Sequence, residues 1–385
     1  MFARLSKSAL AAALALALPF GTASAGFDTR ASSAIVIDLG TGTTLLDHNA
    51  DVPLPPASMS KLMTLLMLFE AVEDGRLDLE TTFSVSTRAR QMGGSRMFLE
   101  ERHRPTVEDL IRGIAVLSGN DAAVVVAEGL AGTEEAFARL ATERARALGM
   151  RDTTIANASG WPHPDHLMSK RDLAILGRHI IETYPQFYPY LSEESFTWNN
   201  IEQRNRLPLL DAGLGVDGLK TGFTSAAGYS LAGSARQGSR RVLFVVGGLG
   251  SEAERQEEAE RIINWAFRQF VQREVLRPGE AVASAAVWMG EAPTVPLVAQ
   301  DPVRILLPAT RQGEMTAEVI YSGPVAAPVT AGQPVGELVI RVPEMDETRV
   351  PLLAGADVAK GGFMVRMRSA LDVVMRRVAG AAAGQ

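Results

Sequence analysis

The hydrophobic pattern after residue 26 predicts both strands and helices. Residues 33–38 are a short run rich in β-branched side chains, and a glycine turn separates them from a second strand-like run at 43–47. Residues 61–70 would be apolar on almost every side of a helix. Because a surface helix would carry a polar stripe, we expect this helix to be buried at the centre of a domain.

Further helices and a hairpin are expected as far as residue 273. Thr106 and Asp109 form a capping-box pattern that predicts a helix over 107–117, and Ser118-Gly119-Asn120 interrupts this helix. The other expected elements are helices over 121–128, 134–148, 170–183 and 252–269 and strands over 229–235 and 240–247. Together these elements predict one mixed α/β (α+β) domain over residues 26–273.

The pattern changes after about residue 271. Short alternating or β-branched runs, separated by proline and glycine turns, predict a small all-β domain over 274–360. These runs are 282–288, 303–307, 318–321 and 337–342.

Helical periodicity returns at 362–380, within the terminal segment 361–385. Its apolar side chains gather in an arc of about 120°. Residues 360–378 carry five cations and one acid. This pattern predicts an amphipathic helix that lies on a membrane surface containing anionic lipid. The alternative is a helix that packs on the β domain or on a partner.

The first 25 residues have the pattern of a signal peptide. Arg4 and Lys7 precede an apolar run at 9–20, and Ala23-Ser24-Ala25 is a small-residue cleavage site. The apolar run is too short to span a bilayer. We therefore expect export, cleavage after Ala25 and a periplasmic protein, held at the outer face of the inner membrane by its C-terminal helix.

The amino-acid composition excludes several kinds of functional site. The 385 residues are 46% hydrophobic and 21% charged, as in globular proteins, and the net charge of −6 does not point to nucleic acid as a partner. Cysteine is absent, which excludes disulfides, thiolate metal sites and a cysteine nucleophile. His163 and His166 lie in a proline-rich segment with no further ligand at a familiar spacing, so we predict no metal site and no cofactor.

Ser58 and Lys61 are the first candidates for catalysis. If the apolar helix starts here, the two side chains lie three residues apart on one face. A desolvated Lys61 would lose its proton near neutral pH and could then take the proton of the Ser58 hydroxyl. The helix N-terminus would favour an oxyanion that forms beside the serine. The alternative is an ordinary first turn with a surface lysine.

Two more segments complete the pattern. Ser118 could relay protons and Asn120 could donate to a substrate carbonyl, although Asn120 also fits as a helix N-cap. Lys220 would supply positive charge for a substrate carboxylate and help to keep Lys61 neutral, and Thr221 offers a hydroxyl to the same carboxylate. Gly222 would let a peptide substrate approach the backbone of an edge strand.

These three segments, in this order, resemble the motifs of the penicillin-recognising serine acyltransferases. Almost all of the chain after residue 25 is similar to low-molecular-mass penicillin-binding proteins that act as D-alanyl-D-alanine carboxypeptidases. Ser118-Gly-Asn-Asp-Ala122 and Val216-Asp-Gly-Leu-Lys-Thr-Gly222 carry much of this similarity. The resemblance implies a transpeptidase-like fold, with an antiparallel sheet and an all-helical subdomain.

The resemblance also implies roles for other residues. The backbone N–H groups of Ser58 and Phe223 would hold the scissile carbonyl, and Arg255 would contact the terminal carboxylate of the substrate. The alternative for Arg255 is a surface position on a charged helix. Asp172 and Arg206 match family positions that we expect to support the cleft. The substrates would be the stem peptides of peptidoglycan, and β-lactams would acylate Ser58 as covalent inhibitors.

Three other functions stay open at this stage. A serine β-lactamase has the same motifs, but no glutamate between Asp121 and Leu219 has asparagine four residues later, as class A enzymes require. A DD-endopeptidase or transpeptidase would apply identical chemistry to cross-links. A non-catalytic wall-binding protein would need none of the three motifs.

Overall fold

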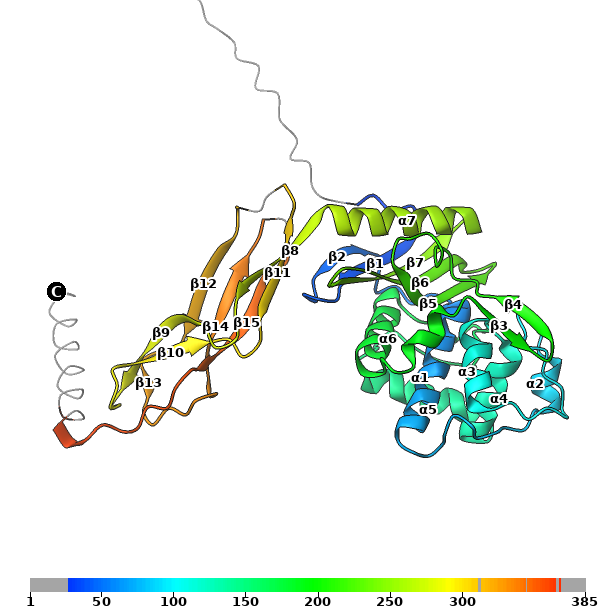
Figure 1. Cartoon of the computed structure of the whole chain (residues 1–385), viewed down its shortest axis with the longest axis horizontal. Helices are drawn as coiled ribbons and strands as arrows, with labels where there is room; N and C mark the ends of the chain where they lie inside the picture. The colour runs from blue at the N-terminus through cyan, green and yellow to red at the C-terminus, as the bar shows by residue number, and fades with distance from the viewer. Residues whose placement is uncertain (1–26, 311–312, 344, 365–366, 368–385) are drawn as a thin grey trace, which may run out of the picture.

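The computed structural model describes residues 27–310, 313–343, 345–364 and 367. The predicted signal peptide and most of the predicted C-terminal helix lie outside these residues. Figure 1 shows two lobes, one of helices around a sheet and one made of strands, with α7 (Glu252–Arg268) leading from the first into the second. No helix in the described ranges combines the length and the apolar character that a bilayer-spanning segment needs.

A five-stranded antiparallel sheet forms the centre of the first lobe, in the order β2-β1-β7-β6-β5. The strands are β1 (Ser33–Asp38), β2 (Thr44–His48), β5 (Val216–Thr224), β6 (Gly228–Gln237) and β7 (Arg240–Leu249). The antiparallel sheet predicted from the family resemblance is confirmed. β5 lies at one edge, so one side of this strand has no strand partner in the sheet.

The two faces of the sheet serve two separate cores. Along β7, Leu243 and Val245 pack with the helical subdomain, whereas Phe244 and Val246 pack with α7. This division follows from the period of two in a strand, which turns successive side chains to opposite faces. Both faces are therefore covered, and the edge strand β5 borders the cavity that holds Ser58.

Six helices make up the subdomain beneath the sheet. They are α1 (Lys61–Glu73), α2 (Thr87–Gln91), α3 (Val107–Ala115), α4 (Asn120–Ala131), α5 (Glu134–Ala147) and α6 (Lys170–Thr183). The central position predicted for α1 is confirmed, because Leu62, Leu65 and Leu66 are completely buried. The subdomain also includes the short 3-10 helices η1 (Ala57–Ser60) and η2 (Tyr188–Ser192) and a hairpin of β3 (Ser195–Trp198) and β4 (Ile201–Arg204).

The junction between α3 and α4 differs from one interpretation of the sequence. The capping box of Thr106 and Asp109 is present at the start of α3. However, Gly119 is the N-cap of α4, and Asn120 is its first helical residue. The interpretation of Asn120 as an N-cap is therefore wrong, because its side chain turns to Lys61 and Gly93 instead of to its own helix.

The second lobe is built from strands, as predicted. It contains a six-stranded sheet in the order β12-β14-β15-β10-β9-β13 and a separate pair, β11-β8. The strands are β8 (Phe270–Leu276), β9 (Ala281–Trp288), β10 (Thr294–Val298), β11 (Val303–Pro308), β12 (Thr316–Tyr321), β13 (Val325–Ala326), β14 (Pro334–Arg341) and β15 (Thr348–Ala354). The domain boundary expected after residue 273 falls within β8.

Candidate active site

Ser58 and Lys61 meet at the start of α1. Ser58 lies in η1, and the chain then continues directly into α1, of which Lys61 is the first residue. This geometry brings the Lys61 Nζ to 2.8 Å from the Ser58 Oγ. The alternative of a surface lysine is wrong, because Lys61 is 0% exposed.

The environment of Lys61 favours the neutral amine. Its Nζ contacts the Ser58 hydroxyl, the Asn120 Oδ1 at 2.7 Å and the Ser159 carbonyl oxygen, and it forms no ion pair with a carboxylate of the described residues. Burial lowers the pKa of Lys61 well below its usual value, and the nearby charges of Lys220 and Arg206 lower it further, against a smaller opposite effect of Asp121. A neutral amine at this distance can accept the serine proton.

The turn between α3 and α4 forms a second wall. Ser118 is 3% exposed and adopts a φ of 60°. The Asn120 Nδ2 donates to the Gly93 carbonyl oxygen at 2.8 Å, which leaves one of its two hydrogens for another acceptor. Ser118 faces the same cavity as Ser58, although its hydroxyl makes no hydrogen bond to Lys61 in the described structure.

Asp121 anchors the chain segment that lies opposite the turn between α3 and α4. Its carboxylate accepts from the backbone N–H of Met97 at 2.9 Å and from that of Leu99 at 3.0 Å. The backbone N–H of Asn120 donates to the Ser95 carbonyl oxygen at 2.8 Å. The cavity wall that includes Gly94 and Ser95 is therefore tied to the start of α4.

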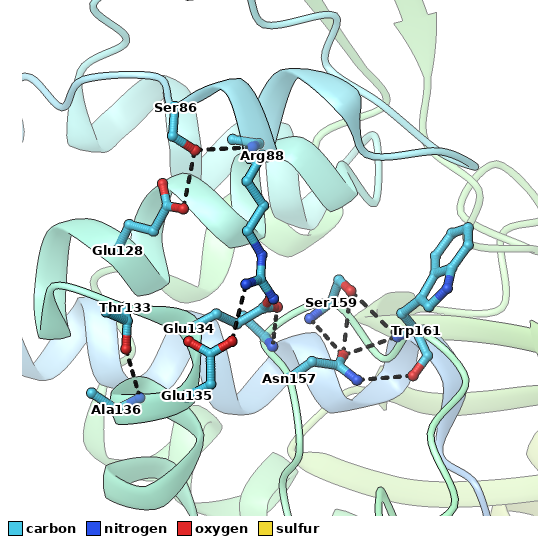
Figure 2. A network of polar contacts seen from close by, with 12 residues as sticks. Ser86, Arg88, Glu128, Thr133, Glu134, Glu135, Ala136, Asn157, Ser159 and Trp161 are labelled. Atoms are coloured by element: carbon cyan, nitrogen blue, oxygen red, sulfur yellow. Dashed lines mark hydrogen bonds and ion pairs between the residues drawn. The ribbon is translucent and has the colours of Figure 1, made fainter.

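A tight loop brings the Ser159 carbonyl to Lys61. Figure 2 shows the hydrogen bonds of Asn157 that shape this loop. The Asn157 Oδ1 accepts from the backbone N–H groups of Ser159, Gly160 and Trp161 at 2.8–3.2 Å, and its Nδ2 donates to the Trp161 carbonyl oxygen. Buried Glu134 accepts from the Ala158 N–H at 3.0 Å and pairs with Arg88. The loop is therefore shaped by one amide side chain and anchored by one carboxylate.

Edge strand β5 forms the remaining wall. A β-carbon on Gly222 would come within 3.0 Å of the Pro56 carbonyl oxygen and 3.2 Å of the Ala57 β-carbon. A side chain at position 222 would therefore crowd the turn that carries Ser58, whereas the approach of a peptide to the backbone of this edge strand stays a prediction. Phe223 is 54% exposed, and its ring lies 4.3 Å from that of Tyr229.

Three cationic side chains gather beyond the serine. Burial, with the charges of Arg206 and Arg255, lowers the pKa of Lys220 to about 7. Arg255 is 6% exposed, so the alternative of a surface arginine is wrong. Its Nε has no hydrogen-bond partner among the described residues, and Glu252 lies 3.7 Å from its guanidinium. Arg206 was expected only to support the cleft, but it lines the cavity itself. This excess of positive charge favours the binding of a carboxylate group.

One cavity of about 400 Å³ collects most of the predicted residues. Its lining includes Ser58, Ser118, Asn120, Thr221, Gly222, Phe223 and Arg255. Lys61 and Lys220 are not in the lining and lie buried beneath it. The structure thus brings together all nine candidates from four separate stretches of sequence.

Comparison with known proteins agrees with this site. Residues 20–250 match the family model described as D-alanyl-D-alanine carboxypeptidase, and residues 270–360 match that of the C-terminal domain of penicillin-binding protein 5. The chain belongs to the D-alanyl-D-alanine carboxypeptidase family. Relatives of this family include the carboxypeptidase DacD of Escherichia coli, 34% identical over 88% of this chain and 90% of the relative. DacF of Bacillus subtilis is 32% identical over 88% of each chain.

Solved structures of the carboxypeptidase family have the same fold. Penicillin-binding protein 5 of Haemophilus influenzae superposes with a TM-score of 0.81, at 31% identity over 87% of this chain and 99% of that one. Penicillin-binding protein 6B of Escherichia coli gives 0.71, at 32% identity over 88% of this chain and 98% of that one.

The sequence did not lead us to predict that the loop at 157–161 contributes to the active site. The only local signal was an asparagine shortly before glycine, a combination typical of turns closed by an asparagine side chain. Asp172 lies outside the cavity lining and accepts from the Asp152 N–H and the Thr153 hydroxyl, in keeping with a supporting position. The two histidines of the segment, His163 and His166, accept backbone N–H groups through Nδ1.

Proposed function

We propose that this chain removes the terminal D-alanine from pentapeptide stems of peptidoglycan through an acyl-enzyme on Ser58. The observation that carries the proposal is the 2.8 Å contact between a fully buried Lys61 amine and the Ser58 hydroxyl. A serine activated by a neutral lysine needs no histidine, and neither imidazole of the 163–166 segment is hydrogen-bonded to Ser58.

In the first step, Lys61 accepts the Ser58 proton while Oγ attacks the carbonyl of the penultimate D-alanine. The negative charge that develops on the carbonyl oxygen is stabilised by the backbone N–H groups of Ser58 and Phe223. The C–N bond then breaks, and the departing D-alanine amine takes a proton, for which Ser118 provides a relay from Lys61. Water releases the product by the same steps and regenerates Ser58.

The terminal carboxylate of the substrate binds among Lys220, Thr221 and Arg255, with Arg206 nearby. Burial lowers the pKa of Lys61 and of Lys220, and the neighbouring positive charges lower both pKa values further. The negative charge of a bound carboxylate raises the pKa of Lys220. Substrate binding therefore keeps Lys220 protonated, and the protonated side chain attracts the carboxylate. Glu252 also lines the cavity and lies 3.7 Å from the Arg255 guanidinium, but its side chain is largely exposed to solvent.

Mass spectrometry of purified muropeptides tests this function. Incubation with the protein should remove one alanine from pentapeptide monomers, and Ser58→Ala should abolish the loss. Cleavage of cross-linked dimers without loss from monomers would instead identify an endopeptidase. Absence of any product, together with no covalent labelling by a fluorescent penicillin, would support a non-catalytic wall-binding protein.

β-Lactams should acylate the same serine. Penicillin-binding protein D2 of Listeria monocytogenes, 29% identical over 63% of this chain and 99% of that one with a TM-score of 0.58, is described in an ampicillin-bound form. Labelling of this chain should disappear in Ser58→Ala. Rapid turnover of penicillin without a stable adduct would favour the β-lactamase alternative.

We also propose export to the periplasm and attachment to the outer face of the inner membrane. The residue pattern of the first 25 positions supports the first step. For the second, Phe363 and Met364, at the start of the predicted amphipathic helix, are 77% and 69% exposed. Truncation after Ala359 should release the protein from membranes and leave activity on soluble pentapeptide unchanged. Sedimentation of the truncated chain with membranes would refute the anchor.

A further inference from the structure

Two consecutive carbonyl groups of the loop at 157–161 are hydrogen-bonded to α1. The Ser159 carbonyl oxygen accepts from the Lys61 Nζ, and the Ala158 carbonyl oxygen accepts from the Thr64 hydroxyl at 2.7 Å. Lys61 and Thr64 lie three residues apart, so they occupy neighbouring positions on one face of the helix. The position of the Ser159 carbonyl relative to the base is therefore linked to the position of Ala158.

The contact with Ser159 determines where the lone pair of a neutral Lys61 points. A neutral amine has two N–H hydrogens and one lone pair. The Asn120 Nδ2 donates to the Gly93 carbonyl oxygen, so the Asn120 Oδ1 is the atom that faces Nζ, at 2.7 Å. This oxygen and the Ser159 carbonyl oxygen can only accept. With both amine hydrogens donated to them, the lone pair faces the third neighbour, the Ser58 hydroxyl.

A buried carboxylate holds Ala158 from the other side. Glu134, the first residue of α5, is 5% exposed, and its Oε1 accepts from the Ala158 N–H at 3.0 Å. Its Oε2 pairs with the guanidinium of Arg88 on α2. Figure 2 shows Arg88 extending to Glu134, which lies close to the loop that carries Ser159. The N–H and the carbonyl group of Ala158 are therefore both paired, one with α5 and the other with α1.

The negative charge of Glu134 is compensated in place. A buried carboxylate is destabilising unless a cation pairs with it. Arg88 provides this cation, and the N-terminus of α5 also favours a negative charge at its first residue. The carboxylate is thus held by two helices while it accepts from the loop.

We propose that Glu134 is a positioning residue for Lys61, and that Arg88 holds it in place. Through the backbone of Ala158, Glu134 keeps the next carbonyl oxygen on Lys61 and thereby directs the lone pair of the amine towards Ser58. This inference rests on the serine chemistry of the proposed function, and it adds a residue that contacts neither the substrate nor the reacting atoms.

Glu134→Ala tests the proposal through the rate of acylation. The variant leaves the Ala158 N–H without its acceptor, so the second-order rate constant for acylation by a fluorescent penicillin should fall about 10–100-fold. Rates are referred to the fraction of the protein that is labelled at completion, so unfolded protein does not affect them. A rate constant within about twofold of that of the intact protein would overturn the proposal.

The acidic limb of the pH profile of acylation is a readout that a merely structural role would not move. The carbonyl oxygen that faces Lys61 stabilises its ammonium form, so loss of this contact should lower the pKa of Lys61 further and shift the limb to lower pH. Lys220, Arg206 and Asp121, the charged groups that act on Lys61, stay unaltered. A slower Glu134→Ala protein with an unmoved limb would overturn the positioning role.

Three further variants separate the hydrogen bond from the charges. Arg88→Met leaves the carboxylate without its cation and should slow acylation. The double variant Arg88→Met with Glu134→Gln carries a neutral amide that needs no cation and still accepts from Ala158, so its rate should stay within about threefold of the intact protein. Glu135→Ala is the matched control, because Glu135 pairs with the same arginine at 3.0 Å but its side chain is 64% exposed. An equal loss of rate in Glu134→Ala and in either the double variant or Glu135→Ala would overturn the proposal.

Release of D-alanine from a pentapeptide tests the proposed function separately. Release by the intact protein, together with acylation that Glu134→Ala does not affect, would overturn the positioning role alone. No release by the intact protein, together with slower acylation and a shifted acidic limb in Glu134→Ala, would overturn the carboxypeptidase function and support the positioning role. An intact protein that neither releases D-alanine nor becomes labelled would overturn both.

Discussion

Gly160 packs against the carbonyl group of Ala57, the residue before the nucleophile, so closely that a β-carbon on Gly160 would overlap the Ala57 oxygen. The same oxygen accepts a hydrogen bond from the Ser60 hydroxyl at 3.0 Å. Ala57 itself adopts a φ of 50°, in the left-handed region that costs a non-glycine residue about 1–3 kcal/mol. Gly160 and Ser60 therefore hold a strained turn that determines where Ser58 lies.

Gly160→Ala should displace this turn and with it the Ser58 hydroxyl. A displacement of about 1 Å at the reacting atoms typically lowers a rate about 100-fold. We expect acylation by a fluorescent penicillin to slow by about that factor. Gly132→Ala is the matched control, because Gly132 also has a positive φ, of 79°, but has open space around its α-carbon. Equal acylation rates in the two variants would show that the contact with Ala57 is unimportant.

Asn157→Ala should make Lys61 a less effective general base, although Asn157 does not contact Lys61. The substitution removes five hydrogen bonds that shape the loop bearing the Ser159 carbonyl, and that carbonyl accepts from Lys61. We expect kcat for D-alanine release to fall about 10–100-fold, with a smaller change in KM. Asn157→Asp keeps an acceptor for the three N–H groups and should restore part of the rate. Rates of both variants equal to that of the intact protein would refute this positioning role.

The pH profile of kcat/KM should fall above about pH 7. Burial and the charges of Arg206 and Arg255 lower the pKa of Lys220 to about 7, so its positive charge is present below that pH and is lost above it. Since kcat/KM reports the free enzyme, a substrate that binds through its carboxylate should lose efficiency on the alkaline side. Lys220→Arg keeps its charge and should move this limb upward. An alkaline limb at the same pH in both proteins would assign it to another group.

Lys170→Met should stabilise the protein at neutral pH. Lys170 is 1% exposed, forms no ion pair in the described part of the chain, and burial lowers its pKa to about 8. Between about pH 8 and 10.5 the unfolded chain binds more protons at this site than the folded one, so the unfavourable contribution of Lys170 is complete below pH 8 and vanishes towards pH 10.5.

Urea unfolding should accordingly show a gain of about 2–3 kcal/mol for Lys170→Met at pH 7 and little gain at pH 10.5. Lys360→Met, at an exposed lysine, should change stability at neither pH. A destabilised Lys170→Met protein at pH 7 would mean that the ammonium has a stabilising environment that its burial does not indicate.

Local periodicity was enough to predict some features of this protein. Residues three apart at the start of a helix are neighbours whatever the rest of the chain does, so the contact between Ser58 and Lys61 could be expected from the sequence. The apolar character of α1 required burial, and the capping box at Thr106 requires only four consecutive residues. The order of the motifs then indicated the family.

Tertiary structure alone decided the electrostatics and the outline of the site. The pKa of a lysine depends on the water removed and the charges brought near by all surrounding segments, and for Lys61 these include Lys220 and Arg206, which are distant in sequence. In the same way, the residues next to a glycine in the sequence do not show which backbone segment it will contact. Gly222 and Gly160 both leave room for Ala57. Contacts between residues one helical turn apart depend on the local sequence alone, whereas the burial of a side chain depends on every segment that packs around it.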